Sequence, residues 1–234
     1  MRIFTTLLVA AVLPAACKSG MQSPSVPFRM KDHEKESVAI RDAVARGDLG
    51  GAKREAANLA LLPVDDSVAT AWRQKLDAMI VAASRVAGAA DLKDASAGLG
   101  PLARTCGDCH AMLGRPGPAV SEPAAGQASG VAPYMVRHEW AVSQMWDGLA
   151  IPSEDAWKAG AQALSEAPLS PETLTPGKTP VPGVEALEQS VHDLGRQAQA
   201  TGKVAARARL FGDVMATCGE CHQWLGGGPD GGPR

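Results

Sequence analysis

Two nearly identical pentapeptides constrain this chain more than any other feature of its sequence. CGDCH occupies Cys106 to His110, and CGECH occupies Cys218 to His222, at an offset of 112 residues. The chain has five cysteines, and all except Cys17 lie in these two motifs. Any fold must therefore present two equivalent groups of two thiols and one imidazole.

Three kinds of site use cysteines at this spacing. A four-thiolate zinc site is disfavoured. Paired zinc knuckles usually lie tens of residues apart, whereas these two motifs are 112 residues apart. Zinc also gives no reason for a histidine after each pair. A thioredoxin-like redox pair needs a preceding strand, and neither motif follows an apolar, β-branched run. Covalent attachment of a c-type haem accounts for every fixed position, because the thiols form thioethers and the histidine ligates iron. The motifs predict two haem c groups, with His110 and His222 as proximal ligands.

The residues upstream of each motif are also duplicated. MKDHEKESVAIRDAV, from Met30, aligns with MVRHEWAVSQMWDGL, from Met135, at an offset of 105. Since the motifs are 112 residues apart, the second half carries a seven-residue insertion, which we place in the proline-rich segment 167–183. The sequence thus predicts two homologous halves.

Composition and helix signals predict an all-α fold. Alanine, glycine and leucine dominate, whereas tyrosine occurs once and phenylalanine three times, which disfavours β-sheets. Asp48 and Ser153 occupy equivalent helix-capping positions in the two halves. We expect a distortion at 98–101, which contains Pro101. The expected helices are 30–46, 48–62, 65–87 and 91 to the motif, then 133–149, 153–165, 182–201 and 203–225.

The motif closes each half instead of opening it, and this position resembles the class II cytochromes c, the cytochrome c′ type. In that family a four-helix bundle carries haem on its last helix. The resemblance implies two tandem four-helix bundles, at 29–116 and 132–228, joined by a linker at 117–131 whose composition suggests two bundles on a string. The family's single-domain members lack the duplication.

Two residues in each half could ligate the distal side of the iron. On a 3-4 spacing, Met30 and His33 share an apolar stripe of the first expected helix, and Met135 and His138 share the equivalent stripe. We prefer His33 and His138, since a buried imidazole without a partner is costly. Met30 and Met135 are the alternative, and an open distal site is the third possibility. In the first half, Ile80 stands at the position that matches His192, so His192 has no histidine counterpart. We expect His192 at the surface.

The N-terminus has the pattern of a bacterial export signal. A short apolar run follows Arg2, and LPAAC resembles the lipobox of lipoproteins, which implies a signal peptide at 1–16 and lipidation of Cys17. Pro14 stands where the lipobox has leucine, so ordinary cleavage near Ala16 remains an alternative. Both routes export the chain to the periplasmic side of a bacterial membrane. We expect a flexible spacer at 17–28 and a disordered tail at 229–234.

These features predict a dihaem electron-transfer protein of the cell envelope and no enzyme activity. Its partners are expected to be redox proteins and, through Cys17, a membrane. A formal charge of −2 without a basic cluster argues against nucleic-acid binding. A gas-binding module for NO or CO is the alternative function, and a dihaem peroxidase is a weaker one, because both need an open iron. No oligomeric state follows from the sequence.

Overall fold

The computed structural model describes residues 26–63, 70–115, 117–121, 131–175, 179 and 181–226. Within them the chain is helical and contains no strand, which confirms the all-α prediction. The expected signal peptide, Cys17 and the tail at 229–234 lie outside the described residues. The helices are α1 (Val26–Ala45), α2 (Leu49–Ala60), α3 (Thr70–Ala87), α4 (Leu92–Met112), α5 (Val131–Ala150), α6 (Glu154–Leu164), α7 (Pro171–Leu174), α8 (Val184–Gln199) and α9 (Val204–Leu225).

The two expected helix caps are confirmed. The Asp48 carboxylate accepts a hydrogen bond from the Gly51 amide at 2.8 Å and caps α2. The Ser153 hydroxyl accepts one from the Ala156 amide at 3.2 Å and caps α6. Each cap satisfies one of the amide groups that a helix start leaves without an intrahelical acceptor.

Helix α4 continues through the expected distortion at 98–101. Pro101 lies inside it and has no amide proton to donate to the carbonyl of Ala97. Ala97 is exposed, so water can bond the carbonyl that proline leaves unpaired. The helix therefore reaches the CGDCH motif without a break.

Helices pack in the same order in both halves. Helices α1 to α4 pack each on the next, and α5, α6, α8 and α9 repeat this sequence of contacts. The short helix α7 lies inside the proline-rich segment of the second half. No helix of the described part of the chain is both long and apolar enough to cross a membrane.

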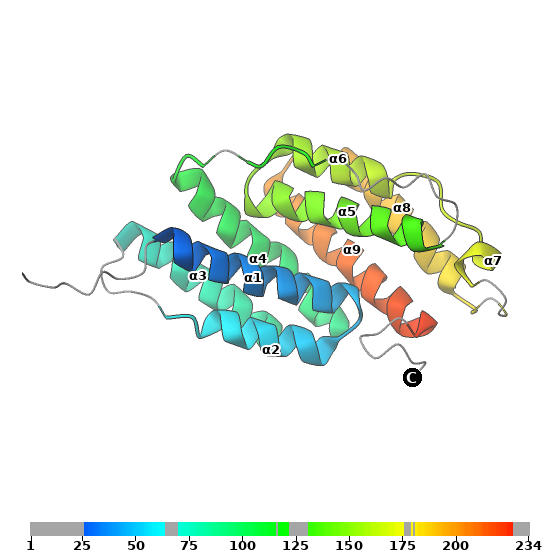
Figure 1. Ribbon diagram of the computed structural model, residues 1–234, viewed down its shortest axis with the longest axis horizontal. Coiled ribbons are helices and arrows are strands. Elements are labelled where there is room, and N and C mark those ends of the chain that lie inside the picture. Colours follow the sequence, from blue (N-terminus) through cyan, green and yellow to red (C-terminus); the bar gives the residue numbers. More distant parts are fainter. Residues whose placement is uncertain are drawn as a thin grey trace, which may run out of the picture.

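The halves share one hydrophobic core instead of lying apart on a string. Helices α4 and α9 lie side by side at the centre of the molecule (Figure 1). A Cβ atom on Gly100 would lie 1.7 Å from the Ala208 carbonyl oxygen, and one on Gly212 would lie 3.0 Å from that of Ser96. Gly100 matches Gly212 in the repeat, and Ser96 matches Ala208, so the two contacts are equivalent. The antiparallel helices α4 and α9 are therefore related by a pseudo-twofold axis.

This antiparallel arrangement separates the two motifs. Each motif lies about ten residues beyond the α4–α9 crossing, in opposite directions along the pair. At a rise of about 1.5 Å per residue, the motifs are roughly 30 Å apart along the helices. A linker-like composition at 117–131 did not reveal this contact, because composition reports chain stiffness and not which faces are covered.

Candidate functional site

Each motif forms the last turns of the closing helix of its half, on α4 and on α9. Its two cysteines are half-buried and unpaired with one another. Burial raises the pKa of the Cys106 thiol to about 11 and that of Cys218 to about 12, so both thiols are protonated at neutral pH.

The glycine between the cysteines marks a close contact with the opposite half. A Cβ atom on Gly107 would lie 2.1 Å from the Leu149 carbonyl oxygen, and one on Gly219 would lie 2.5 Å from that of Val44. Val44 and Leu149 occupy matched positions near the ends of α1 and α5. The end of each half's first helix thus lies directly against the other half's motif, and only glycine leaves room for it.

The motif histidines are held by hydrogen bonds across the same contact. Nδ1 of His110 lies 2.8 Å from the Ala150 carbonyl oxygen, and Nδ1 of His222 lies 2.6 Å from that of Ala45. A carbonyl only accepts, so Nδ1 carries the proton and Nε2 keeps its lone pair. A hydrogen bond from the far ring nitrogen is the usual way in which metal-ligating histidines are oriented.

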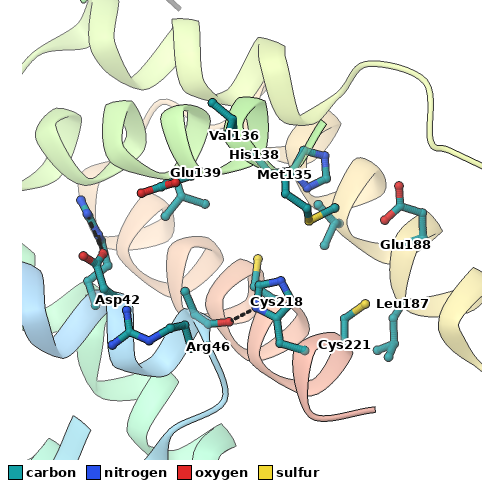
Figure 2. A pocket seen from close by; sticks show the side chains of 15 residues that line it. Asp42, Arg46, Met135, Val136, His138, Glu139, Leu187, Glu188, Cys218 and Cys221 are labelled. Carbon is teal, nitrogen blue, oxygen red and sulfur yellow. Dashed lines mark hydrogen bonds and ion pairs between the residues drawn. The ribbon is translucent and has the colours of Figure 1, made fainter. Parts of the chain in front are cut away.

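A cavity of about 310 Å³ lies beside the second motif (Figure 2). Cys218, Cys221 and His222 form its wall on α9. Residues of α5 and α8 line the opposite side, and the end of α1, from the first half, closes it further. The cavity is therefore completed by both halves of the chain.

Both expected distal residues of the second half line this cavity. Met135 and His138 project from α5 toward the helix that carries Cys218 (Figure 2). Nε2 of His138 is buried and has no hydrogen-bond partner among the described residues. Burial lowers the pKa of His138 to about 4, so its imidazole is neutral at neutral pH. The cavity thus contains two side chains that could ligate a metal from the side opposite the motif.

The corresponding residues of the first half lie on α1. Met30 and His33 are half-buried, and the rest of their stripe, Ser37, Ile40 and Val44, is buried as expected. The cavity at the second motif is lined by α1 only at its far end, which excludes Met30 and His33 from it.

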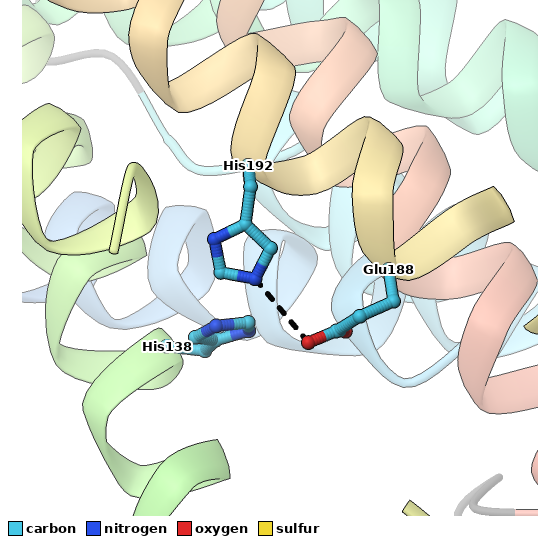
Figure 3. A group of neighbouring side chains, drawn as sticks. All are labelled: His138, Glu188 and His192. Atoms are coloured by element: carbon cyan, nitrogen blue, oxygen red, sulfur yellow. Dashed lines mark hydrogen bonds and ion pairs between the residues drawn. The ribbon is translucent and has the colours of Figure 1, made fainter. Parts of the chain in front are cut away.

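A buried polar cluster next to His138 was not expected from the sequence. It joins Tyr134 of α5 to Glu188 and His192 of α8. Figure 3 shows Glu188 and His192 beside His138. The expectation of a surface position for His192 is wrong, because its side chain is completely buried. The spacing of Glu188 and His192, four residues apart on one helix face, was the available indication that they interact.

Hydrogen bonds close this cluster around the carboxylate. The Tyr134 hydroxyl donates to Glu188, and His192 Nε2 lies 3.2 Å from the same oxygen and 2.6 Å from the hydroxyl. The Tyr134 ring also packs on the His138 ring, with centroids 4.3 Å apart. The cluster therefore positions the ring of His138.

His138, Glu188 and His192 together have the composition of a metal site. One ligand atom each from His138, Glu188 and His192 lies within 4.8 Å of the other two. Two imidazoles and a carboxylate are donors suited to zinc, iron or cobalt. His138 is thus a possible ligand on either side, to the cavity or to the cluster.

Comparisons with protein-family models, with curated proteins and with solved structures found no match to this chain.

Proposed function

We propose that each motif carries one covalently attached haem c and that the chain is a dihaem electron-transfer protein. In this proposal Cys106 and Cys109 hold the first haem and Cys218 and Cys221 the second. His110 and His222 are their proximal ligands. The bound group supplies a one-electron Fe(III)/Fe(II) couple.

The geometry of the second cavity is the observation that carries this proposal. The His222 ring is anchored through Nδ1 to Ala45, which leaves the Nε2 lone pair as a ligand. Across the same cavity His138 buries an Nε2 that makes no hydrogen bond in the part of the chain that the structure describes. A buried imidazole nitrogen without a partner is costly, and coordination to iron would remove that cost.

The cavity also suits the flat apolar face of a porphyrin. Val142 of α5 and the α8 residues Leu187 and Val191 give it an apolar lining. The charged members of its lining include Arg41, Arg46 and Glu139, of which Arg46 and Glu139 are exposed, so propionates could meet arginine near the rim.

We propose His33 and His138 as the distal ligands, with Met30 and Met135 as the alternative. Two imidazoles favour a lower reduction potential, whereas a methionine thioether raises it. With both axial positions filled, iron exchanges electrons without binding substrate, which favours a carrier over an enzyme.

The export pattern sets the proposed location. A signal peptide at 1–16 and lipidation of Cys17 would place the haem domains on the periplasmic side of a bacterial membrane. Redox proteins of the cell envelope are then the expected partners.

The test is to produce the chain in a host that attaches haem c and to measure haem per polypeptide by mass spectrometry and pyridine haemochrome absorbance. We expect two haems, and one in each of the variants Cys106→Ala/Cys109→Ala and Cys218→Ala/Cys221→Ala. A polypeptide without added mass would refute the proposal. Low-spin EPR signals support filled axial sites, whereas a Soret shift with CO supports the gas-binding alternative.

A further inference from the structure

We propose that the two haem sites differ in reduction potential and that the second is the lower, because a buried Glu188 carboxylate faces it while the Lys75 ammonium stands beside the first. This inference rests on the proposed haem attachment. It adds an order of reduction that the two nearly identical motifs do not indicate: the first haem is reduced before the second.

Helices α3 and α8 occupy equivalent places in the two halves but carry different chemistry. At the repeat offset of 112, Lys75 and Leu76 of α3 correspond to Leu187 and Glu188 of α8. Both helices pack on the closing helix of their half. The acidic Glu188 of the second site therefore corresponds to Leu76 of the first. The basic Lys75 of the first site corresponds to Leu187 of the second.

Glu188 is held as a carboxylate inside the protein. It is 5 % exposed and lines the cavity that contains Cys218 and Cys221. Its oxygen accepts from Tyr134 and His192, and from the Leu169 amide at 3.3 Å. Burial alone would raise the pKa of Glu188, but these hydrogen bonds outweigh it and lower the pKa.

The neighbouring histidine hydrogen-bonds this carboxylate. Nε2 of His192 donates toward Glu188 and Tyr134, whereas its Nδ1 is buried and makes no hydrogen bond within the described part of the chain. Glu188 is thus the acidic group of the cluster, and it lines the cavity.

Lys75 has the opposite effect at the first motif. Its ammonium lies 3.8 Å from the Asp108 carboxylate, which is inside CGDCH. Asp108 corresponds to Glu220 in CGECH, so the lysine offsets at the first motif an acidic residue that both motifs share.

Electrostatics then orders the two potentials. Reduction of ferric haem adds one electron, so a nearby anion stabilises the ferric form and a nearby cation stabilises the ferrous form. The burial of Glu188 keeps its charge poorly screened by salt. Because the motifs are roughly 30 Å apart along the α4–α9 pair, each charge acts on its own haem.

The experiment is an EPR-monitored redox titration of the haem-loaded full chain. We expect two one-electron waves. Glu188→Gln should raise the lower wave alone, and Lys75→Gln should lower the upper wave alone. We expect Glu188→Gln to change the equilibrium constant for reduction about tenfold, which is about 59 mV for one electron. The half-exposed Lys75 should have a smaller effect. Lys158→Gln removes an exposed lysine in the middle of α6, a helix that does not line the cavity, and should move neither wave.

Coincident waves in the unchanged protein would overturn the inference, as would a Glu188→Gln protein whose lower wave stays in place. If Glu188→Gln does not take up haem, Lys75→Gln decides alone: an unmoved upper wave refutes the inference. Haem content is measured first, because a chain without two haems refutes the proposed function instead.

Discussion

The imidazole of His222 donates its Nδ1 proton to the carbonyl of Ala45, 177 residues earlier in the chain. His110 makes the equivalent bond to Ala150, at the end of the first helix of the other half. Each half thus provides the acceptor that orients the motif histidine of the other. This reciprocity gives a physical reason for keeping both copies in one chain, because neither half contains the whole of its own site.

Substitution of the glycine inside CGECH should weaken this mutual contact. In Gly219→Ala the new methyl would lie 2.5 Å from the Val44 carbonyl oxygen and 2.7 Å from the Leu92 side chain. Because neither α1 nor α9 can move without disturbing the core, we expect a loss of about 1–3 kcal/mol in the free energy of unfolding. Urea denaturation measures it.

Gly202→Ala is the matched control for that substitution. Among the described residues, a methyl group on Gly202 would meet no atom within 4 Å beyond its chain neighbours, so alanine there should leave stability unchanged or increase it by up to about 1 kcal/mol. If Gly219→Ala and Gly202→Ala lowered the free energy of unfolding equally, the contact with α1 would not be the reason for glycine in the motif.

The central helix pair offers a second graded comparison. A methyl on Gly100 would meet the Ala208 carbonyl oxygen at 1.7 Å, whereas one on the matched Gly212 would meet that of Ser96 at 3.0 Å. We therefore expect Gly100→Ala to lower the free energy of unfolding by at least about 2 kcal/mol, and Gly212→Ala by less than about 1 kcal/mol. Thermal unfolding followed by circular dichroism would measure both, and the reverse order would contradict the packing described here.

The sequence predicted local features of this molecule better than its long-range ones. The caps at Asp48 and Ser153 depend only on neighbouring residues, and both were correct. His192 was misplaced because a polar residue on a helix gives the same pattern whether it faces water or a buried partner. Its hydrogen-bond partner Tyr134 is 58 residues away in the sequence, and no periodicity reveals that contact. The glycine that follows the first cysteine in both motifs is the sequence feature that corresponds to the cross-half contact.

A buried arginine of α9 supports the second half. Arg207 is 6 % exposed and bonds both oxygens of Glu154, at 2.6 and 2.8 Å, and the Thr201 carbonyl. Its guanidinium also lies over the Trp157 ring, 5.2 Å from the centroid. We expect Arg207→Ala to lower the free energy of unfolding by about 1–3 kcal/mol. Arg209→Ala, an exposed arginine of the same helix, should change it by less than about 0.5 kcal/mol.

The same pair should contribute to the acid stability of the protein. Hydrogen bonds from Arg207 are the main cause that lowers the pKa of Glu154, to about 2. A carboxyl with a lower pKa in the folded state stabilises the fold above its ordinary pKa of about 4.5, and that contribution is lost as pH falls toward 2. Glu154 is half-exposed, so the effect is modest. Unfolding midpoints measured from pH 6 to pH 2 should therefore fall less steeply for Arg207→Ala than for the unchanged protein, and parallel curves would contradict this.

The two possible uses of His138 predict different metal binding in loaded and unloaded protein. Without haem, the buried His138 Nε2 makes no hydrogen bond to a described residue, and one ligand atom from each of two imidazoles and a carboxylate lies within 4.8 Å of the other two. The unloaded chain, purified from a host that does not attach haem, should therefore bind one Co(II), visible as d–d absorption near that of tetrahedral sites. Haem-loaded protein should not, because its iron would already hold His138. His192→Ala should abolish Co(II) binding and leave the low-spin EPR signals of loaded protein in place, whereas His138→Ala should remove both Co(II) binding and one of those signals. Stoichiometric Co(II) binding by loaded protein would instead assign His138 to the cluster and leave Met135 facing the iron.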